Sequence, residues 1–177
     1  QKDLLGGDTV LNLRVDPSGV VYDSVSRNPI SGVSAFLYYD DSEPDRSLAG
    51  SLVDEADLGE AQQGQRVPPS GLYRFDAPTD RRYRIQLEPN GVSVSFPSTR
   101  ITPVPEVFVV DGPVQAVDEE EPAAVAAGNE RYFLRFGLEG PAAELSNNHL
   151  PVDPFDTLVS LTKRADTVEA FVGDIIT

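Results

Sequence analysis

The stretch from Gly19 to Tyr39, GVVYDSVSRNPISGVSAFLYY, constrains the fold of this chain more than any other. It holds an apolar run, a turn with Asn28 and Pro29, and a second run rich in β-branched and aromatic residues. Such residues favour strands, whereas Asn, Pro and Gly favour the turn between them. The pattern predicts two strands flanking a turn, with Val33–Tyr39 buried in the centre of a β-sandwich.

Two later segments alternate between apolar and polar residues, as half-buried strands do. In residues 71–75, Tyr73 and Phe75 share the predicted inner face, and residues 82–87 repeat the pattern. The inward residues of the second segment are Tyr83, Ile85 and Leu87. Further strands are expected at residues 9–15, 20–24, 92–96, 106–110 and 131–138. The chain is therefore predicted to be all-β, an antiparallel Greek-key sandwich of roughly seven strands, transthyretin-like or immunoglobulin-like, with a C-terminal β extension.

The expected organisation divides the chain into five parts. They are a linker at 1–8, the sandwich domain at 9–111, an acidic and alanine-rich linker or loop at 112–130, a strand with an irregular bridge at 131–157, and C-terminal strands at 158–177. The segment 112–130 is open to three interpretations, namely a solvated loop, a short helix after Pro122, or a linker. Residues 54–70 are polar and rich in Gly and Pro, which predicts a long, mobile insertion.

The charge narrows the choice of partners. The chain has 14 Lys and Arg against 29 Asp and Glu, a net charge of -15. This field repels phosphates, so neither nucleic acid nor an anionic membrane surface is expected as a partner. No apolar run approaches the roughly 20 residues of a membrane span. Calcium or a basic partner is compatible with the charge, as is a merely soluble surface.

Cysteine and methionine are both absent from the sequence. Disulfides are therefore excluded, although large secreted bacterial proteins commonly lack cysteine too. Because the chain begins at Gln1, we expect a processed or excised piece of a longer protein.

Four motifs in order resemble the B-type domains of Gram-positive collagen adhesins and serine-aspartate-repeat proteins, and the related transthyretin-like carboxypeptidase-regulatory domains. These motifs are GVVYD at 19–23, PISGV at 29–33, GLYRF at 71–75 and YRIQLEP at 83–89. The resemblance covers residues 9–110. It implies a β-sandwich from an extracellular bacterial surface protein.

The C-terminal segment, residues 158–177 from Leu158 to Thr177, is similar to the opening strands of a repeat domain that is widespread in large bacterial and archaeal surface proteins. The matching residues are Lys163, Ala165, Asp166, Gly173, Asp174 and Thr177. A lone opening hairpin leaves strand edges unpaired. These residues either pair back onto their own domain or complete a neighbouring subunit by strand addition.

Calcium is the metal candidate, because hard oxygen ligands suit it. Four acids lie close together in the 40–46 loop: Asp40, Asp41, Glu43 and Asp45. The serine-aspartate-repeat resemblance implies a calcium loop after the first strand, but residues 23–28 depart from that pattern. The alternative for the 40–46 loop is an ordinary solvated acidic loop.

The sequence gives little support for catalysis, for an isopeptide cross-link or for carbohydrate binding. His149 is the single histidine and is expected to be a structural residue in a turn that bonds to the backbone. No nucleophile-elbow or phosphate-binding glycine pattern is present. The collagen-adhesin resemblance implies an isopeptide bond in some members, but neither Lys2 nor Lys163 lies in the first strand. Five tyrosines are expected to fill the core rather than form a carbohydrate-stacking face: Tyr22, Tyr38, Tyr39, Tyr73 and Tyr83.

The expected function is that of a non-enzymatic structural module of an extracellular surface or filament protein, without a cofactor. Its partners would be identical subunits or neighbouring domains, reached through residues 158–177. One alternative is an adhesive module that recognises glycan or protein through loops 40–46 and 54–70. Another is an accessory domain of a secreted hydrolase.

Overall fold

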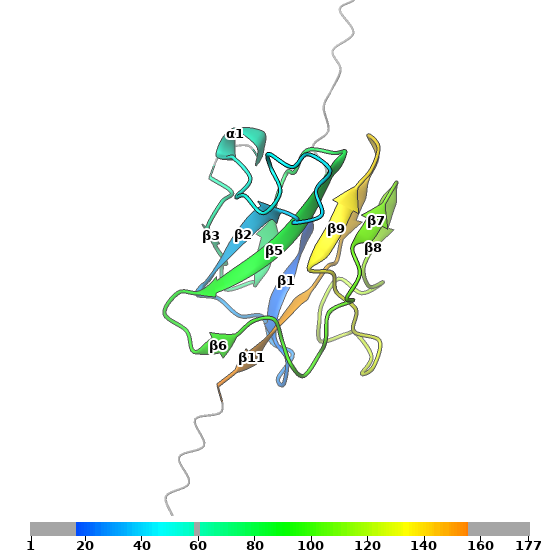
Figure 1. The fold of residues 1–177 in the computed structure, drawn as a ribbon. Helices are drawn as coiled ribbons and strands as arrows, with labels where there is room; N and C mark the ends of the chain where they lie inside the picture. Colours follow the sequence, from blue (N-terminus) through cyan, green and yellow to red (C-terminus); the bar gives the residue numbers. More distant parts are fainter. Residues whose placement is uncertain (1–16, 59–60, 156–177) are drawn as a thin grey trace, which may run out of the picture.

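The computed structural model describes residues 17–58 and 61–155 (Figure 1). The strands are β1 (Ser18–Asp23), β2 (Val33–Tyr39), β3 (Gln65–Arg66), β4 (Leu72–Arg74), β5 (Arg81–Pro89), β6 (Val94–Ser95), β7 (Phe108–Val110), β8 (Pro113–Gln115), β9 (Arg135–Leu138), β10 (Glu144–Ser146) and β11 (Leu150–Pro154). One short helix, α1 (Glu55–Leu58), is found in these ranges. It is far too short to cross a bilayer, and no other described segment is a candidate membrane helix.

The described strands form three sheets. One has the order β4-β1-β11-β6, the second β3-β2-β5-β9-β7, and β10 pairs with β8 in a two-stranded sheet. Residues from all three sheets share one hydrophobic core, as shown by Val152 of β11, Ile85 of β5 and Leu145 of β10. The predicted all-β class is thus confirmed.

The alternation that predicted the strands also sets which side chains reach the core. Tyr73 and Phe75 are buried whereas Leu72 is exposed, because neighbouring residues of a strand point to opposite faces. In β5 the inward residues are those predicted: Tyr83, Ile85 and Leu87.

Four of the five tyrosines considered for a carbohydrate-stacking face are buried, as expected of core residues: Tyr22, Tyr39, Tyr73 and Tyr83. The exception is Tyr38 of β2, which is half-buried on the outer face of the sheet. The Arg84 guanidinium lies 4.8 Å from the centre of its ring.

The predicted antiparallel arrangement needs correction, because the sheets are mixed. β1 pairs with β11, β7 with β9, and β8 with β10, all in parallel. Parallel neighbours require a long crossover connection, and each of these pairs is separated by other elements in the sequence. Eleven strands are described instead of the roughly seven that were expected.

The predicted boundary at residue 111 does not mark the end of the sandwich. Strand β9 pairs with β5 inside the five-stranded sheet, and β11 lies between β1 and β6. Phe136 and Val152 are fully buried in the common core. The part predicted as a bridge, 131–157, therefore belongs to the sandwich as far as residue 155.

The insertion at 54–70 was expected to be mobile, but its described residues are attached to both main sheets. Leu58 and Val67 are buried in the core. The side-chain amide of Gln63 accepts a hydrogen bond from the Leu37 amide at 3.0 Å and donates to the Leu37 carbonyl at 2.7 Å. Gln65 binds the Arg74 backbone in the same way, accepting at 3.1 Å and donating at 2.7 Å.

Gln62 extends this pattern along β4, since its side chain accepts a hydrogen bond from the Asp76 amide at 2.6 Å. Gln65 thus occupies backbone groups of β4, an edge strand of the four-stranded sheet, and Gln62 occupies the Asp76 amide just beyond that strand. Polar side chains here take the place of a further strand.

Candidate functional site

The first and last described strands, β1 and β11, lie side by side in the middle of the four-stranded sheet (Figure 1). They run in parallel, with Val21 opposite Leu150 and Asp23 opposite Val152. We call this pairing, from Ser18 to Ser24 on one side and from residue 148 to 153 on the other, the terminal seam. It joins segments about 129 positions apart in the sequence.

Backbone hydrogen bonds extend the terminal seam beyond the paired residues. The Asn148 amide donates to the Ser18 carbonyl at 3.0 Å, and the Ser24 amide donates to the Val152 carbonyl at 2.9 Å. Since bonding groups alternate along a strand, Pro151 lies on the opposite phase from residues 148 and 152. Its missing N–H therefore removes no hydrogen bond to β1.

Gly19 allows β1 and the backbone of Asn148 to approach closely at the start of the terminal seam. A Cβ atom at Gly19 would lie only 2.4 Å from the carbonyl oxygen of Asn148, so no larger residue fits there without a shift of the backbone. The Asn148 side chain points the other way. It accepts from the Phe133 amide at 2.8 Å and donates to the Phe133 carbonyl at 3.0 Å.

His149 adds a side-chain bond to the seam. The Val20 amide donates to Nδ1 of His149 at 3.1 Å, and Nε2 lies 2.9 Å from the Glu119 carbonyl oxygen. Because a carbonyl can only accept, Nε2 carries the proton and the ring is neutral. Burial lowers the pKa of His149 and favours this neutral form. The expectation of a structural histidine that bonds to the backbone is confirmed.

The groups around His149 include few charges that could compensate a protonated ring. The titratable or charged side chains that line the small cavity beside it are Tyr22, Glu130 and Arg131. Glu130 forms an ion pair with Arg27, so its charge is already engaged.

At the other end of the seam, Asp153 is a buried carboxylate that receives several hydrogen bonds. The Ser24 hydroxyl donates to it at 2.6 Å, the Thr99 hydroxyl at 2.9 Å and the Thr99 amide at 2.7 Å. The Ser98 hydroxyl is a further donor. Burial alone would raise the pKa of Asp153, but these donors outweigh it and hold the pKa well below its usual range.

The predicted calcium loop is the second candidate site, and its first acid is engaged by an arginine. Arg135 of β9 donates to both carboxylate oxygens of Asp40, at 2.7 and 2.8 Å, and Asp40 is fully buried. The Ser42 amide and hydroxyl donate to it as well. Burial opposes ionisation, yet the Arg135 and Ser42 bonds prevail and lower the pKa of Asp40 to about 2.

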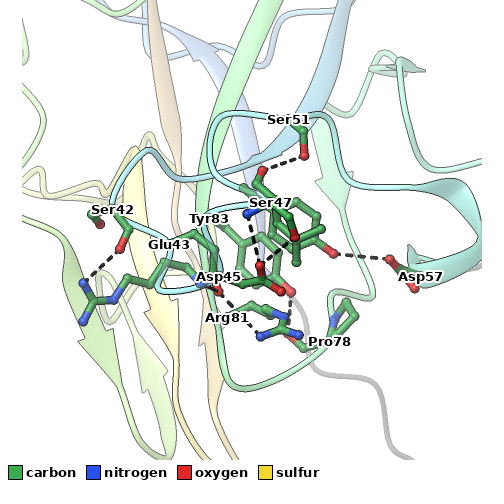
Figure 2. Close-up of polar contacts among 12 residues, drawn as sticks. Ser42, Glu43, Asp45, Ser47, Ser51, Asp57, Pro78, Arg81 and Tyr83 are labelled. Carbon is green, nitrogen blue, oxygen red and sulfur yellow. Dashed lines mark hydrogen bonds and ion pairs between the residues drawn. The ribbon is translucent and has the colours of Figure 1, made fainter.

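Figure 2 shows the polar contacts around Glu43 and Asp45. The buried Glu43 carboxylate accepts from the Arg82 amide at 2.7 Å and lies 3.5 Å from the Arg81 guanidinium. Asp45 is exposed and accepts from the hydroxyl and amide of Ser47 at 2.7 and 3.1 Å, bonds that lower its pKa. The loop is thereby fastened to β5 and β9.

The four acids do not come together as metal ligands. Asp40 and Glu43 face different arginines, Asp45 turns to its own loop, and Asp41 is exposed. Within residues 17–58 and 61–155, no group of three or more His, Asp or Glu side chains is arranged to hold a metal ion. The structure thus does not assemble the calcium site that was predicted for this loop.

The terminal seam was missed by sequence reasoning. Residues 147–154 were placed in the irregular bridge that follows the expected strand at 131–138, and no strand was predicted there. The available signal was the short apolar run from Leu150 to Val152, which is consistent with a strand buried on both faces. Comparison with known proteins supplies no further guide, because no family model, curated protein or solved structure matches this chain.

Proposed function

We propose that this chain is a non-enzymatic, in-line structural module of an extracellular surface or filament protein. The observation that supports this function is the parallel pairing of β1 with β11. Residues 1–16 and 156–177 continue the chain on either side of the described body.

The parallel direction has a simple geometrical consequence. A chain that enters at the start of β1 and leaves at the end of β11 does so at opposite ends of the same pair of strands. An antiparallel pair would have brought both ends to one side of the body. Copies linked through these ends would follow one another along a line, which suits a spacer between a surface and whatever lies at its tip.

The test measures a tandem array of the full 177-residue chain. Small-angle X-ray scattering on one, two and three linked copies should show a maximum dimension that grows by a full body length with each copy. A dimension that grows much more slowly, as for bodies that fold back on each other, would contradict the in-line arrangement.

The coupling of copies is a separate part of the proposal. Residues 158–177 would add strands to a neighbouring subunit, and they lie outside the described residues. Sedimentation velocity on the full chain and on a chain that ends at residue 157 would test this. We expect assembly of the full chain and loss of it on truncation; equal behaviour of the two would remove strand donation.

A further inference from the structure

We propose that the terminal seam carries tension, with its hydrogen bonds loaded in shear when the two ends of the chain are pulled apart. This inference rests on the proposed role as an in-line module. It assigns the mechanical resistance to one pair of strands, β1 and β11, rather than to the sandwich as a whole.

The direction of pulling decides how the bonds share the force. Tension applied at the start of β1 and the end of β11 slides the two strands along each other, so all bonds between them stretch together. If the strands were pulled apart from one end, the same bonds would break one after another. The parallel pairing places the chain's own ends in the first of these geometries.

Side-chain bonds strengthen both ends of the seam. Near its start the Val20 amide is bonded to His149, and at its end the Ser24 hydroxyl is bonded to Asp153. Each of these bonds links the first side of the seam, Ser18 to Ser24, directly to the segment that contains β11. They add to the backbone ladder in the direction of sliding.

The position of the seam protects its hydrogen bonds from water. Val21, Leu150 and Val152 are fully buried, so water cannot easily replace a bond that is stretched. Strands β4 and β6 flank the pair on its outer sides. Sliding of β1 or β11 would therefore also disturb the pairing with a neighbouring strand.

A single-molecule experiment can compare the two directions in one protein. Handles at Gln1 and Thr177 load the seam in shear. Cysteines introduced as Val25→Cys and Phe155→Cys, both at exposed positions beyond the same end of the seam, load it by peeling. The chain has no cysteine of its own, so attachment is specific. We expect a severalfold higher rupture force in shear; equal forces in the two directions would overturn the proposal.

A matched pair of variants isolates the contribution of the seam. Ser24→Ala removes a hydroxyl that bonds to Asp153 from the residue just after β1, within the seam, whereas Thr99→Val removes a hydroxyl that bonds to the same carboxylate from outside the seam. Ser24→Ala should lower the shear rupture force, and Thr99→Val should leave it near the wild-type value. Equal effects of the two would assign the force to general stability, contradicting the seam.

The tension-bearing seam and the in-line spacer can be rejected independently of each other. Arrays that extend with each copy but rupture equally in both directions would keep the spacer and reject the tension-bearing seam. Arrays that fold back would reject the spacer even if the seam proved strong in shear.

Discussion

Two buried aspartates, Asp40 and Asp153, are stabilised by different kinds of hydrogen-bond donor. Asp40, in the loop after β2, is bonded to a guanidinium from β9. Asp153, in β11, is bonded to the hydroxyls of Ser24, Ser98 and Thr99 and to a backbone amide. The first fastens a surface loop to a sheet, and the second fastens the end of the last described strand to the end of the first.

In both regions a buried carboxylate joins one segment of the fold to another through its hydrogen bonds, but the kind of donor differs. Both carboxylates have a lowered pKa, so both remain ionised at neutral pH. Burying such a charge is tolerated only when hydrogen bonds replace the lost water. In the terminal seam, neutral hydroxyls and an amide supply these hydrogen bonds to Asp153. In the 40–46 loop, the Arg135 guanidinium supplies them to Asp40 together with Ser42.

The largest effect is expected from Asp153→Ala, which leaves four donors without their acceptor. We expect a loss of about 3–5 kcal/mol in the free energy of unfolding, because several buried donors lose their acceptor and each unsatisfied donor costs about 1–3 kcal/mol. Urea unfolding measures it. Asp45→Ala, at an exposed acid of the loop, is the control and should shift the urea midpoint far less than Asp153→Ala does. Similar losses in the two variants would show that Asp153 has no special role.

The next largest loss of stability is expected when the ion pair that fastens the 40–46 loop is broken. Arg135→Ala leaves Asp40 buried without its cation, and because the arginine is partly exposed we expect a loss of about 2–3 kcal/mol. Adding Asp40→Asn to Arg135→Ala should recover part of it, since the unpaired charge is then gone. A double variant as unstable as the sum of the single changes would argue against direct coupling.

Acidity should separate the contribution of His149 to stability from those of the two buried aspartates, because the pKa of Asp153 is lowered as that of Asp40 is, and both aspartates lose their contribution only below pH 3.8. His149 has a pKa below its ordinary 6.5 in the folded protein, so its contribution to stability is complete above pH 6.5 and declines as the pH falls below it. The contribution of Asp40 is complete above 3.8 and declines toward about 2, a change of about 2 kcal/mol.

Thermal unfolding from pH 7.5 to 2.5 should therefore show two steps of declining stability. The variant His149→Gln keeps an acceptor and a donor without titrating near pH 6, so the upper step should disappear in it. An upper step that survives this substitution would have to come from another group.

The smallest effect is expected from calcium. Because Asp40 and Glu43 are engaged by arginine side chains and a backbone amide, millimolar calcium should leave the melting temperature of the full chain unchanged within about 1 °C. Magnesium at the same concentration is the control for ionic strength. A clear rise with calcium alone would revive the calcium loop.

Much of the fold was predictable from local patterns, whereas the seam was not. Alternation identified β2, β4 and β5, because each carries its inward residues at every second position. Strand β11 was missed because Pro151 and Pro154 argue against a strand until its partner is known. That partner lies about 129 positions away, and the Arg135 that binds Asp40 lies 95 positions away. Local patterns contain no information about such distant pairs.

The glutamine amides on the outer side of β4 bear on how identical copies could coexist at high density. An uncovered edge strand invites lateral aggregation with the neighbouring molecule, in any register. Amides carry no charge, so salt would not screen the hydrogen bonds by which they cover this edge. Crowded copies would therefore associate less through this edge of the sheet.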